Sequence, residues 1–301
     1  MPAITVSTIL QQLLNGFVIG SIFVMVAMGL TIIFGLMGIV NFAHGAFYAV
    51  GAYVGLTVLG LVGGIGGGSA GFFLSILIVP VVVGILGAAA EASVIRPLYD
   101  RDLIYSLLLT FGLMLVIHEL IKIVWGVGGR TFNQPPILNF TVSLGVIDYP
   151  GYRLFVVAMT AVIAAAVWLF LHYTDLGMIV RAATENRDMV KVQGINITHI
   201  YTLVFAIGTA IAGLAGVLHA PLVSVYPEMG VSIIVQSFVV VVIGGLNSFR
   251  GSVAAGVLVG EVRSLTYLIE PQAVDIVIFV LMAVVLLVRP QGLMGAIGGV
   301  D

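Results

Sequence analysis

The residues of this chain that could do chemistry are few, and many of them lie in one stretch just past its midpoint. Charged residues make up 8% of the sequence, yet both signs follow closely on one another from Asp175 to Lys191. The segment 176–199 reads LGMIVRAATENRDMVKVQGINITH and lies between two long apolar runs. A helix that lies on lipid is predominantly basic, so the mixture of Arg181, Glu185 and further charges favours contact with another protein. The alternative is an ordinary solvated loop.

The sequence lacks the motifs of the enzyme classes that could power or catalyse a reaction. Neither the phosphate-binding pattern GxxxxGK[ST] nor the zinc-binding pattern HExxH occurs. The chain has no cysteine, which excludes disulfides and thiolate metal sites. We therefore predict that the chain is not an enzyme and holds no metal or cofactor, and that energy for its function comes from a partner or an ion gradient.

The elements that carry these residues read as membrane-spanning helices. Hydrophobic residues make up 61% of the chain and the mean hydropathy is +1.24, which is far above the range of soluble proteins. The apolar runs are longer than barrel strands, and lipid offers the backbone no hydrogen bonds, so the spans must be helices. We predict an all-α polytopic membrane protein of about eight spans, some short or broken, in one domain over 1–301. The near-neutral charge gives no reason to expect nucleic acid.

The expected spans are separated by loops of distinct composition. We expect the segment 62–71 (VGGIGGGSAG) to be too rich in glycine for a helix. The segment 126–152 is the longest polar stretch, and its prolines predict an ordered external loop. In the region 233–268, two apolar runs around a break indicate two short spans or half-helices. The remaining expected spans are 9–34, 46–61, 72–95, 103–125, 154–173, 200–221 and 273–288.

The distribution of lysine and arginine predicts the orientation of the chain. Cytoplasmic loops of membrane proteins carry an excess of these residues. If each expected unit crosses once, one side receives Arg96, Arg101, Arg181, Arg187, Lys191 and Arg289, and the other receives Arg130 and Arg153. The segment 176–199 is therefore expected in the cytoplasm and the N-terminus outside.

Two glycine-flanked breaks share the pattern G-x-x-N-x-x-[HR]-G. The first holds Asn41, His44 and Gly45, and the second holds Asn247, Arg250 and Gly251. Matching helix breaks indicate a transport pathway, because unwound backbone can meet a polar solute. The lysine and arginine count puts both breaks on the same side of the membrane, so the repeat is expected to be parallel. If the repeat is inverted, one of the expected membrane crossings is wrong.

The single residues at these breaks also have structural interpretations. His44 could line the solute path, but a histidine there more often satisfies backbone groups. Asn41 and Asn247 could cap exposed N–H groups. Arg250 is expected to reach the membrane interface, and Glu91 is expected to pair with Arg96 nearby.

Several motifs, in order along the chain, resemble the permease subunit of branched-chain amino acid ABC importers. The resemblance extends over residues 11–295, and the length is similar to that of the shorter, LivH-type partner. The motifs are Asn41-Phe-Ala-His-Gly45 followed by Tyr48 and Gly51-Ala-Tyr53, Arg96-Pro97, Gly177-x-x-x-Arg181-Ala182, Gly194-Ile195-Asn196, Gly244-Gly245-Leu246-x-Ser248-x-x-Gly251 and Arg289-Pro290-x-Gly292-Leu293-x-Gly295.

The resemblance implies an ABC-importer permease fold in a bacterial inner membrane. It also implies partners: a homologous LivM-type permease subunit, two cytoplasmic ATPase subunits that bind ATP and Mg, and a periplasmic or extracellular substrate-binding protein. The cargo would be leucine, isoleucine, valine or a similar hydrophobic amino acid, which would cross by a mostly apolar pathway. The segment 176–199 resembles the coupling helix that docks on the ATPase, through Gly177, Arg181, Ala182, Glu185, Arg187 and Gly194.

Three other interpretations remain at this stage. Relatives on the same scaffold carry urea, short amides or other amino acids, and the permease sequence does not decide among these cargoes. An ion-driven secondary transporter would need carboxylates facing the bundle core, and Glu91, Glu119 and Glu261 are few and lie near helix ends. A membrane scaffold that does not transport would not need two glycine-flanked breaks.

Overall fold

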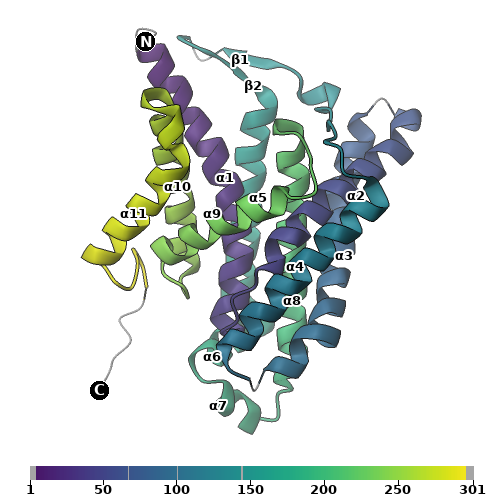
Figure 1. Cartoon of the computed structure of the whole chain (residues 1–301), viewed down its shortest axis with the longest axis vertical. Coiled ribbons are helices and arrows are strands. Elements are labelled where there is room, and N and C mark those ends of the chain that lie inside the picture. Colours follow the sequence, from purple (N-terminus) through teal and green to yellow (C-terminus); the bar gives the residue numbers. More distant parts are fainter. Residues whose placement is uncertain (1–4, 67, 100, 144, 296–301) are drawn as a thin grey trace.

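The chain folds into a bundle of long helices with a small β-hairpin at one end (Figure 1). The computed structural model describes residues 5–66, 68–99, 101–143 and 145–295. The first helix begins at the end of the bundle where the hairpin lies, drawn uppermost, and the short helices α6 (Asp175–Glu185) and α7 (Arg187–Val192) lie at the opposite end. We call these the hairpin end and the α6–α7 end.

Eight helices of the described residues are long and apolar enough to cross a membrane, which confirms the predicted all-α class. Three of these spans include a short turn: Glu91–Leu98 extends α3, Ala220–Leu222 extends α8, and Pro271–Ala273 precedes α11. The helices are α1 (Val6–Met37), α2 (Ala43–Gly66), α3 (Ser69–Ala90), α4 (Leu103–Trp125), α5 (Gly151–Tyr173), α8 (Ile197–His219), α10 (Phe249–Ile269) and α11 (Val274–Val288).

Helix α1 is the buried axis of the bundle, and it packs antiparallel against α10. Ser264 donates to the carbonyl oxygen of Gln12 at 2.7 Å near one end, and the hydroxyls of Thr31 and Ser252 lie 2.6 Å apart near the other. Between them, glycines bring the two backbones together: a Cβ on Gly20 would lie 2.9 Å from the carbonyl oxygen of Gly256. Small residues allow such close approach where lipid supplies no hydrophobic drive between helices.

Helix α9 (Met229–Gly244) is shorter than the others. Its 16 residues span about 24 Å at 1.5 Å per residue, less than the ~30 Å hydrocarbon core. It begins inside the bundle beside the start of α2, where a Cβ on Gly45 would overlap the carbonyl oxygen of Gly230. The irregular region predicted over 233–268 is therefore one short helix followed by one full span, α10.

The segment between α4 and α5 stays outside the spans, as predicted for 126–152. It contains the strands β1 (Thr141–Ser143) and β2 (Asp148–Pro150), which pair antiparallel, and a 3-10 turn at Pro136–Leu138. The hydroxyl of Tyr149 donates to Asn15 Oδ1 at 2.9 Å, which ties the hairpin to α1.

Two sequence-based expectations about local structure are wrong. The segment 62–71 is not a loop, because α2 continues to Gly66 and α3 begins at Ser69. Glycine costs a helix about 1 kcal/mol relative to alanine, but this is a weak preference that the surrounding structure can override. The charged segment is two helices rather than one, because Asn186 adopts an extended conformation (φ −150°, ψ 94°) between α6 and α7.

Candidate functional site

The two short helices at the α6–α7 end are each started by a side-chain cap. The Thr174 hydroxyl accepts a hydrogen bond from the Gly177 backbone N–H at 3.0 Å, and Asn186 Oδ1 accepts one from the Met189 N–H at 3.0 Å. Such caps satisfy N–H groups that a helix start leaves free. After α7 the chain turns back at Gly194, whose φ of 79° is a left-handed conformation that favours glycine.

Small and apolar residues fix these helices to the bundle. A Cβ on Gly177 would overlap the carbonyl oxygen of Phe170, so α6 packs closely against the end of α5. Val180, Ala183 and Val190 are also buried. Helix α6 contacts α1, α5 and α8, and α7 contacts α8. A force on either helix therefore acts directly on the spans.

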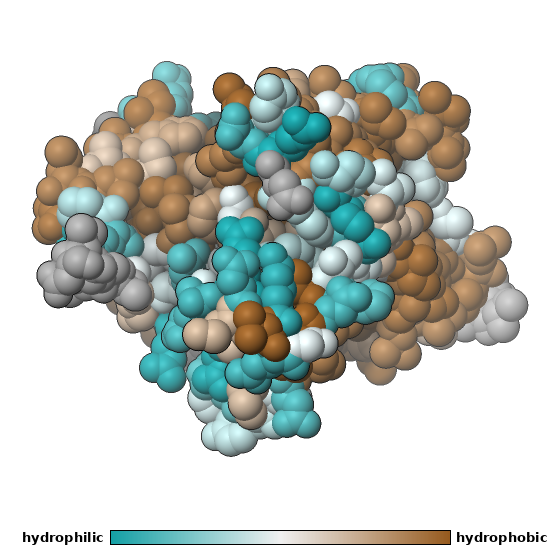
Figure 2. Space-filling model, turned by 90° about the horizontal axis from the view of Figure 1, so that it is seen from below, coloured by the Kyte–Doolittle hydropathy of each residue, from teal (hydrophilic) through white to brown (hydrophobic). Residues whose placement is uncertain are grey.

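The outward side of the same helices carries the charged residues that the sequence singled out. Arg181, Ala182, Glu185, Arg187 and Gly194 are exposed, whereas Gly177 is buried. Figure 2 shows a largely hydrophilic surface at this end, with hydrophobic atoms within it and on the flanks. Exposed apolar side chains accompany the charges: Leu176, Met178, Met189 and Val192. We call these charged and apolar exposed residues of α6 and α7 the α6–α7 surface.

The α6–α7 surface lies next to the second helix break. A Cβ on Gly35, near the end of α1, would lie 3.8 Å from Asn247 Oδ1 and 3.9 Å from Thr184 Cγ2 of α6. The C-terminal segment joins the same place, because the Leu293 N–H donates to the carbonyl oxygen of Ile243 at 2.7 Å. Helix α6, the end of α1 and the α9–α10 break therefore form one contact region.

The two breaks share local geometry but differ in depth and burial. In each, the helix begins two residues after the asparagine. His44 Nε2 lies 3.2 Å from the carbonyl oxygen of Val26 on α1, whereas Asn247 lies beside Gly35, about 14 Å further along α1. His44 and Asn41 are fully buried, while Asn247 and Arg250 are exposed.

The capping roles expected for the two asparagines are wrong. Ser248, not Asn247, caps α10 by accepting from the Gly251 N–H at 3.0 Å. The side-chain amide of Asn41 makes no hydrogen bond within the described residues. His44 contacts backbone, in line with its structural interpretation, and the exposure of Arg250 agrees with an interfacial position. Gly45 and Gly251 both permit close backbone contact, with Gly230 and Gly244.

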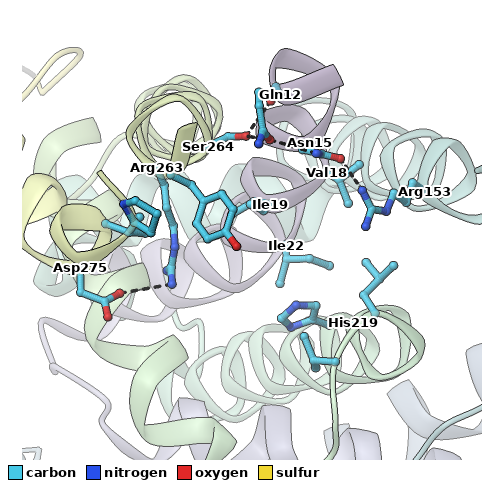
Figure 3. A pocket seen from close by; sticks show the side chains of 15 residues that line it. Gln12, Asn15, Val18, Ile19, Ile22, Arg153, His219, Arg263, Ser264 and Asp275 are labelled. Carbon is cyan, nitrogen blue, oxygen red and sulfur yellow. Dashed lines mark hydrogen bonds and ion pairs between the residues drawn. The ribbon is translucent and has the colours of Figure 1, made fainter. Parts of the chain in front are cut away.

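A cavity opens between α1, α8, α9, α10 and α11 in the half of the bundle nearer the hairpin (Figure 3). It consists of two adjoining hollows of about 500 and 460 Å³, within the size range of small-molecule sites. Arg153 donates to Asn15 at its rim, and the Tyr48 hydroxyl bonds to His219 Nδ1. The residues common to both hollows are Ile19, Ile22, His219, Val223, Arg263 and Asp275.

Arg263 is the residue of this cavity that the sequence analysis missed. Its Nη2 lies 3.2 Å from Asp275 Oδ1, and its guanidinium lies over the Phe23 ring at 5.9 Å, near the middle of α1. Arg263 lies within the α10 span, where a charged residue is costly unless it is paired or faces a water-filled cavity. Such a residue marks a candidate functional site. The mostly apolar pathway stays a prediction, and this cavity combines mostly apolar walls with the charged pair of Arg263 and Asp275.

Comparisons with known proteins agree with one another. The family model described as "Branched-chain amino acid transport system / permease component" matches residues 12–286. The chain is 30% identical to the high-affinity branched-chain amino acid transport system permease proteins LivH of Escherichia coli and BraD of Pseudomonas aeruginosa, with 95% of both chains covered in each case. It is 26% identical to LivM of Salmonella typhimurium over 91% of this chain and 68% of that protein. No solved structure matches the chain significantly.

Proposed function

Because the chain belongs to the branched-chain amino acid transport permease family, we propose that it is the membrane subunit of an ATP-driven importer for leucine, isoleucine, valine or similar hydrophobic amino acids. The chain is a multi-pass membrane protein and a transport permease. In the proposal, two separate ATPase subunits bind ATP and Mg and supply the energy, a LivM-type subunit completes the passage, and an external binding protein delivers the solute.

The observation that carries this proposal is the α6–α7 surface. It combines charges of both signs with exposed Met178, Met189 and Val192, all beyond the ends of the spans. Exposed apolar groups among charges are characteristic of protein interfaces. A lipid-facing helix would lack Glu185 and Asp188 on its outward side. An ATPase surface is the partner that suits a permease.

The contact region at the end of α1 offers a route for the movement. When the ATPases close on ATP, they displace α6. Thr184 then moves against Gly35 and Asn247, and the displacement reaches α1 and the α9–α10 break together. Rigid helices joined at such breaks can rock as bodies. The cavity that α1 and α10 border then changes its opening.

The orientation of the proposal follows from charge. Toward the α6–α7 end lie Arg181, Arg187 and Lys191 of α6 and α7 and Arg96 and Arg101 of the turn between α3 and α4 (Figure 1), and Arg289 follows α11 beside the α9–α10 break. An excess of positive charge favours the cytoplasmic side. This end faces the cytoplasm of a bacterial inner membrane, and the hairpin end meets the binding protein.

The alternatives make different demands on the chain. An ion-driven transporter needs a carboxylate free to bind its ion, and Glu91 and Glu119 are paired with Arg96 and Lys122. Glu261 has no hydrogen bond among the described residues and is the carboxylate to examine in that case. Urea or short amides as cargo would leave the roles of α6 and α7 unchanged.

A paired substitution tests the coupling assignment. In the complete transporter, Arg181→Ala with Glu185→Ala is expected to lower ATP-driven leucine uptake at least about tenfold, a factor equivalent to about 1.4 kcal/mol. ATP hydrolysis by the ATPases continues. The matched control is Arg101→Ala with Asp102→Ala, which removes the same two charges from exposed positions outside α6 and α7. Normal uptake by the first variant, or equal losses in both, would refute the assignment.

A further inference from the structure

The cavity between α1, α8, α9, α10 and α11 holds a charged pair with unused hydrogen-bonding capacity. A guanidinium has five N–H donors, and within the described residues Arg263 makes one hydrogen bond, to Asp275 at 3.2 Å. The Asp275 side chain is 76% exposed, so its carboxylate can accept further bonds. In Figure 3, Arg263 points from α10 into the space that Ile22 and His219 also border.

Part of the wall beside this pair is aliphatic. Ile19 and Ile22 extend from one face of α1, and Val223 follows the turn after α8. All three border both hollows, as do Arg263 and Asp275. A small ligand in this cavity therefore meets a cation, an anion and an aliphatic surface at once. Convergent polar groups in a largely apolar pocket are typical of small-molecule sites.

We propose that this cavity binds an α-amino acid in its zwitterionic form, with the carboxylate on Arg263, the ammonium group on Asp275 and the side chain against Ile19 and Ile22. The inference rests on the proposed import of amino acids and adds the place and the groups that receive the solute. An α-amino acid carries both charges on one carbon. A guanidinium and a carboxylate that lie 3.2 Å apart can meet both of them together.

The arrangement also suits release. Arg263 and Asp275 neutralise each other in the empty cavity and are neutralised by the solute in the filled one, so no unpaired charge is left in either state. The electrostatic part of the binding free energy is therefore only the difference between two paired arrangements. This keeps the solute from being held too tightly. A transport pathway needs sites that a solute can both enter and leave. An amine or a carboxylic acid would pair with one of the two groups and leave the other unmatched.

A cysteine reporter can observe this site directly, because the chain has no cysteine of its own. Val223→Cys places a thiol in the wall of both hollows, and Ser143→Cys places one on the exposed β1 strand as a control. In the assembled transporter, an impermeant thiol reagent is added from outside, with leucine, with leucinamide or with 4-methylpentanoate. The rate of modification is measured at rest and with ATP bound.

Leucine is expected to slow modification of the cysteine at 223 and to leave the cysteine at 143 unaffected. Leucinamide lacks the carboxylate and 4-methylpentanoate lacks the ammonium group. Each is expected to give the same protection only at a concentration at least about tenfold higher than that of leucine. Equal protection by all three compounds would overturn the proposal. Failure of the cysteine at 223 to react from outside in either state would also overturn it.

Substitutions identify the groups. Arg263→Gln in the Val223→Cys background is expected to remove protection by leucine. Arg263→Lys is expected to keep part of the protection, because lysine keeps the positive charge but lacks the planar guanidinium that binds a carboxylate through two hydrogen bonds. Asp275→Asn is expected to abolish the advantage of leucine over 4-methylpentanoate. Labelling of the cysteine at 143 in the same variants reports whether each is folded and inserted. Full protection of an inserted Arg263→Gln variant contradicts the assignment.

The two proposals fail in different ways. If the unaltered transporter accumulates leucine with ATP but leucine does not protect the cysteine at 223, the zwitterion site is wrong and the proposed function stands. If the unaltered transporter does not accumulate any branched-chain amino acid, the proposed function is wrong. In that case protection by urea or acetamide, without protection by leucine, would exclude the zwitterion site as well.

Discussion

The Glu91 carboxylate shows how one side chain joins separate elements at the α6–α7 end. It is fully buried and accepts hydrogen bonds from Arg96 at 3.1 and 3.3 Å, from Thr202 of α8 at 2.6 Å, and from Tyr99. Burial and the bond to Glu91 raise the pKa of Tyr99, so its hydroxyl remains a donor. The network closes the π-helical turn Glu91–Ile95 against α8.

Removal of this carboxylate is expected to loosen the α6–α7 end. Glu91→Ala leaves Thr202 and Tyr99 without their shared acceptor, which is expected to cost about 2 kcal/mol of folding stability. Glu91→Gln keeps an acceptor oxygen, so its loss should be smaller. Thermal unfolding of the purified protein in detergent measures both. Equal midpoints for the two variants would contradict the role of the network.

Residue pairs could be predicted from the sequence when the partners are close along the chain. The expected Glu91–Arg96 pair forms, and Glu119 pairs with Lys122 three residues further along the same helix. Lys122 also pairs with Glu228 at 2.9 Å, and Arg263 pairs with Asp275 across a turn. These longer pairings depend on how the helices pack, which spacing in the sequence does not contain.

Helix α2 depends on glycine for its position. It lies against α8 and the start of α9, and a Cβ on Gly51 would overlap the carbonyl oxygen of Gly213. A Cβ on Gly216 would likewise overlap the carbonyl oxygen of Tyr48. These glycines thus allow close packing of α2 against α8. The glycines at its far end, in contrast, misled the loop prediction for 62–71.

Two alanine substitutions in α2 are expected to have opposite effects. Gly51→Ala forces backbone atoms apart and is expected to destabilise the protein by about 1–3 kcal/mol. Gly60→Ala meets nothing within 4 Å and lies on an exposed face, so it is expected to be neutral or to stabilise by up to about 1 kcal/mol. The midpoint of thermal unfolding in detergent compares the two. A destabilised Gly60→Ala with an unaffected Gly51→Ala would contradict the packing.

Elements were predicted well where apolar runs have clear ends. The span 103–125 has the same bounds in the structure. The breaks were located correctly, but their asparagines do not cap, because Ser248 reaches the free N–H group at one break and Asn41 is held in a buried position at the other. The two breaks have the same sequence pattern, but the burial of their asparagines depends on the helices packed around each break, and these helices differ.

At the scale of the whole molecule, each end of the bundle is proposed to face one side of the membrane. In this cysteine-free chain, Ser143→Cys and Met189→Cys place exposed thiols at the hairpin end and on the α6–α7 surface. An impermeant reagent added to intact cells is expected to label the first and to label the second after the membrane is disrupted. The reverse pattern would invert the proposed orientation.

The central claim is that this chain does not itself supply the energy for transport and that ATPase subunits drive it through the α6–α7 surface. The most direct measurement is leucine accumulation in proteoliposomes, with the chain alone under a proton or sodium gradient and with its partner subunits, the binding protein and ATP. We expect accumulation of leucine against a gradient in the complete system and none by the chain alone. Concentrative uptake by the chain alone would contradict it.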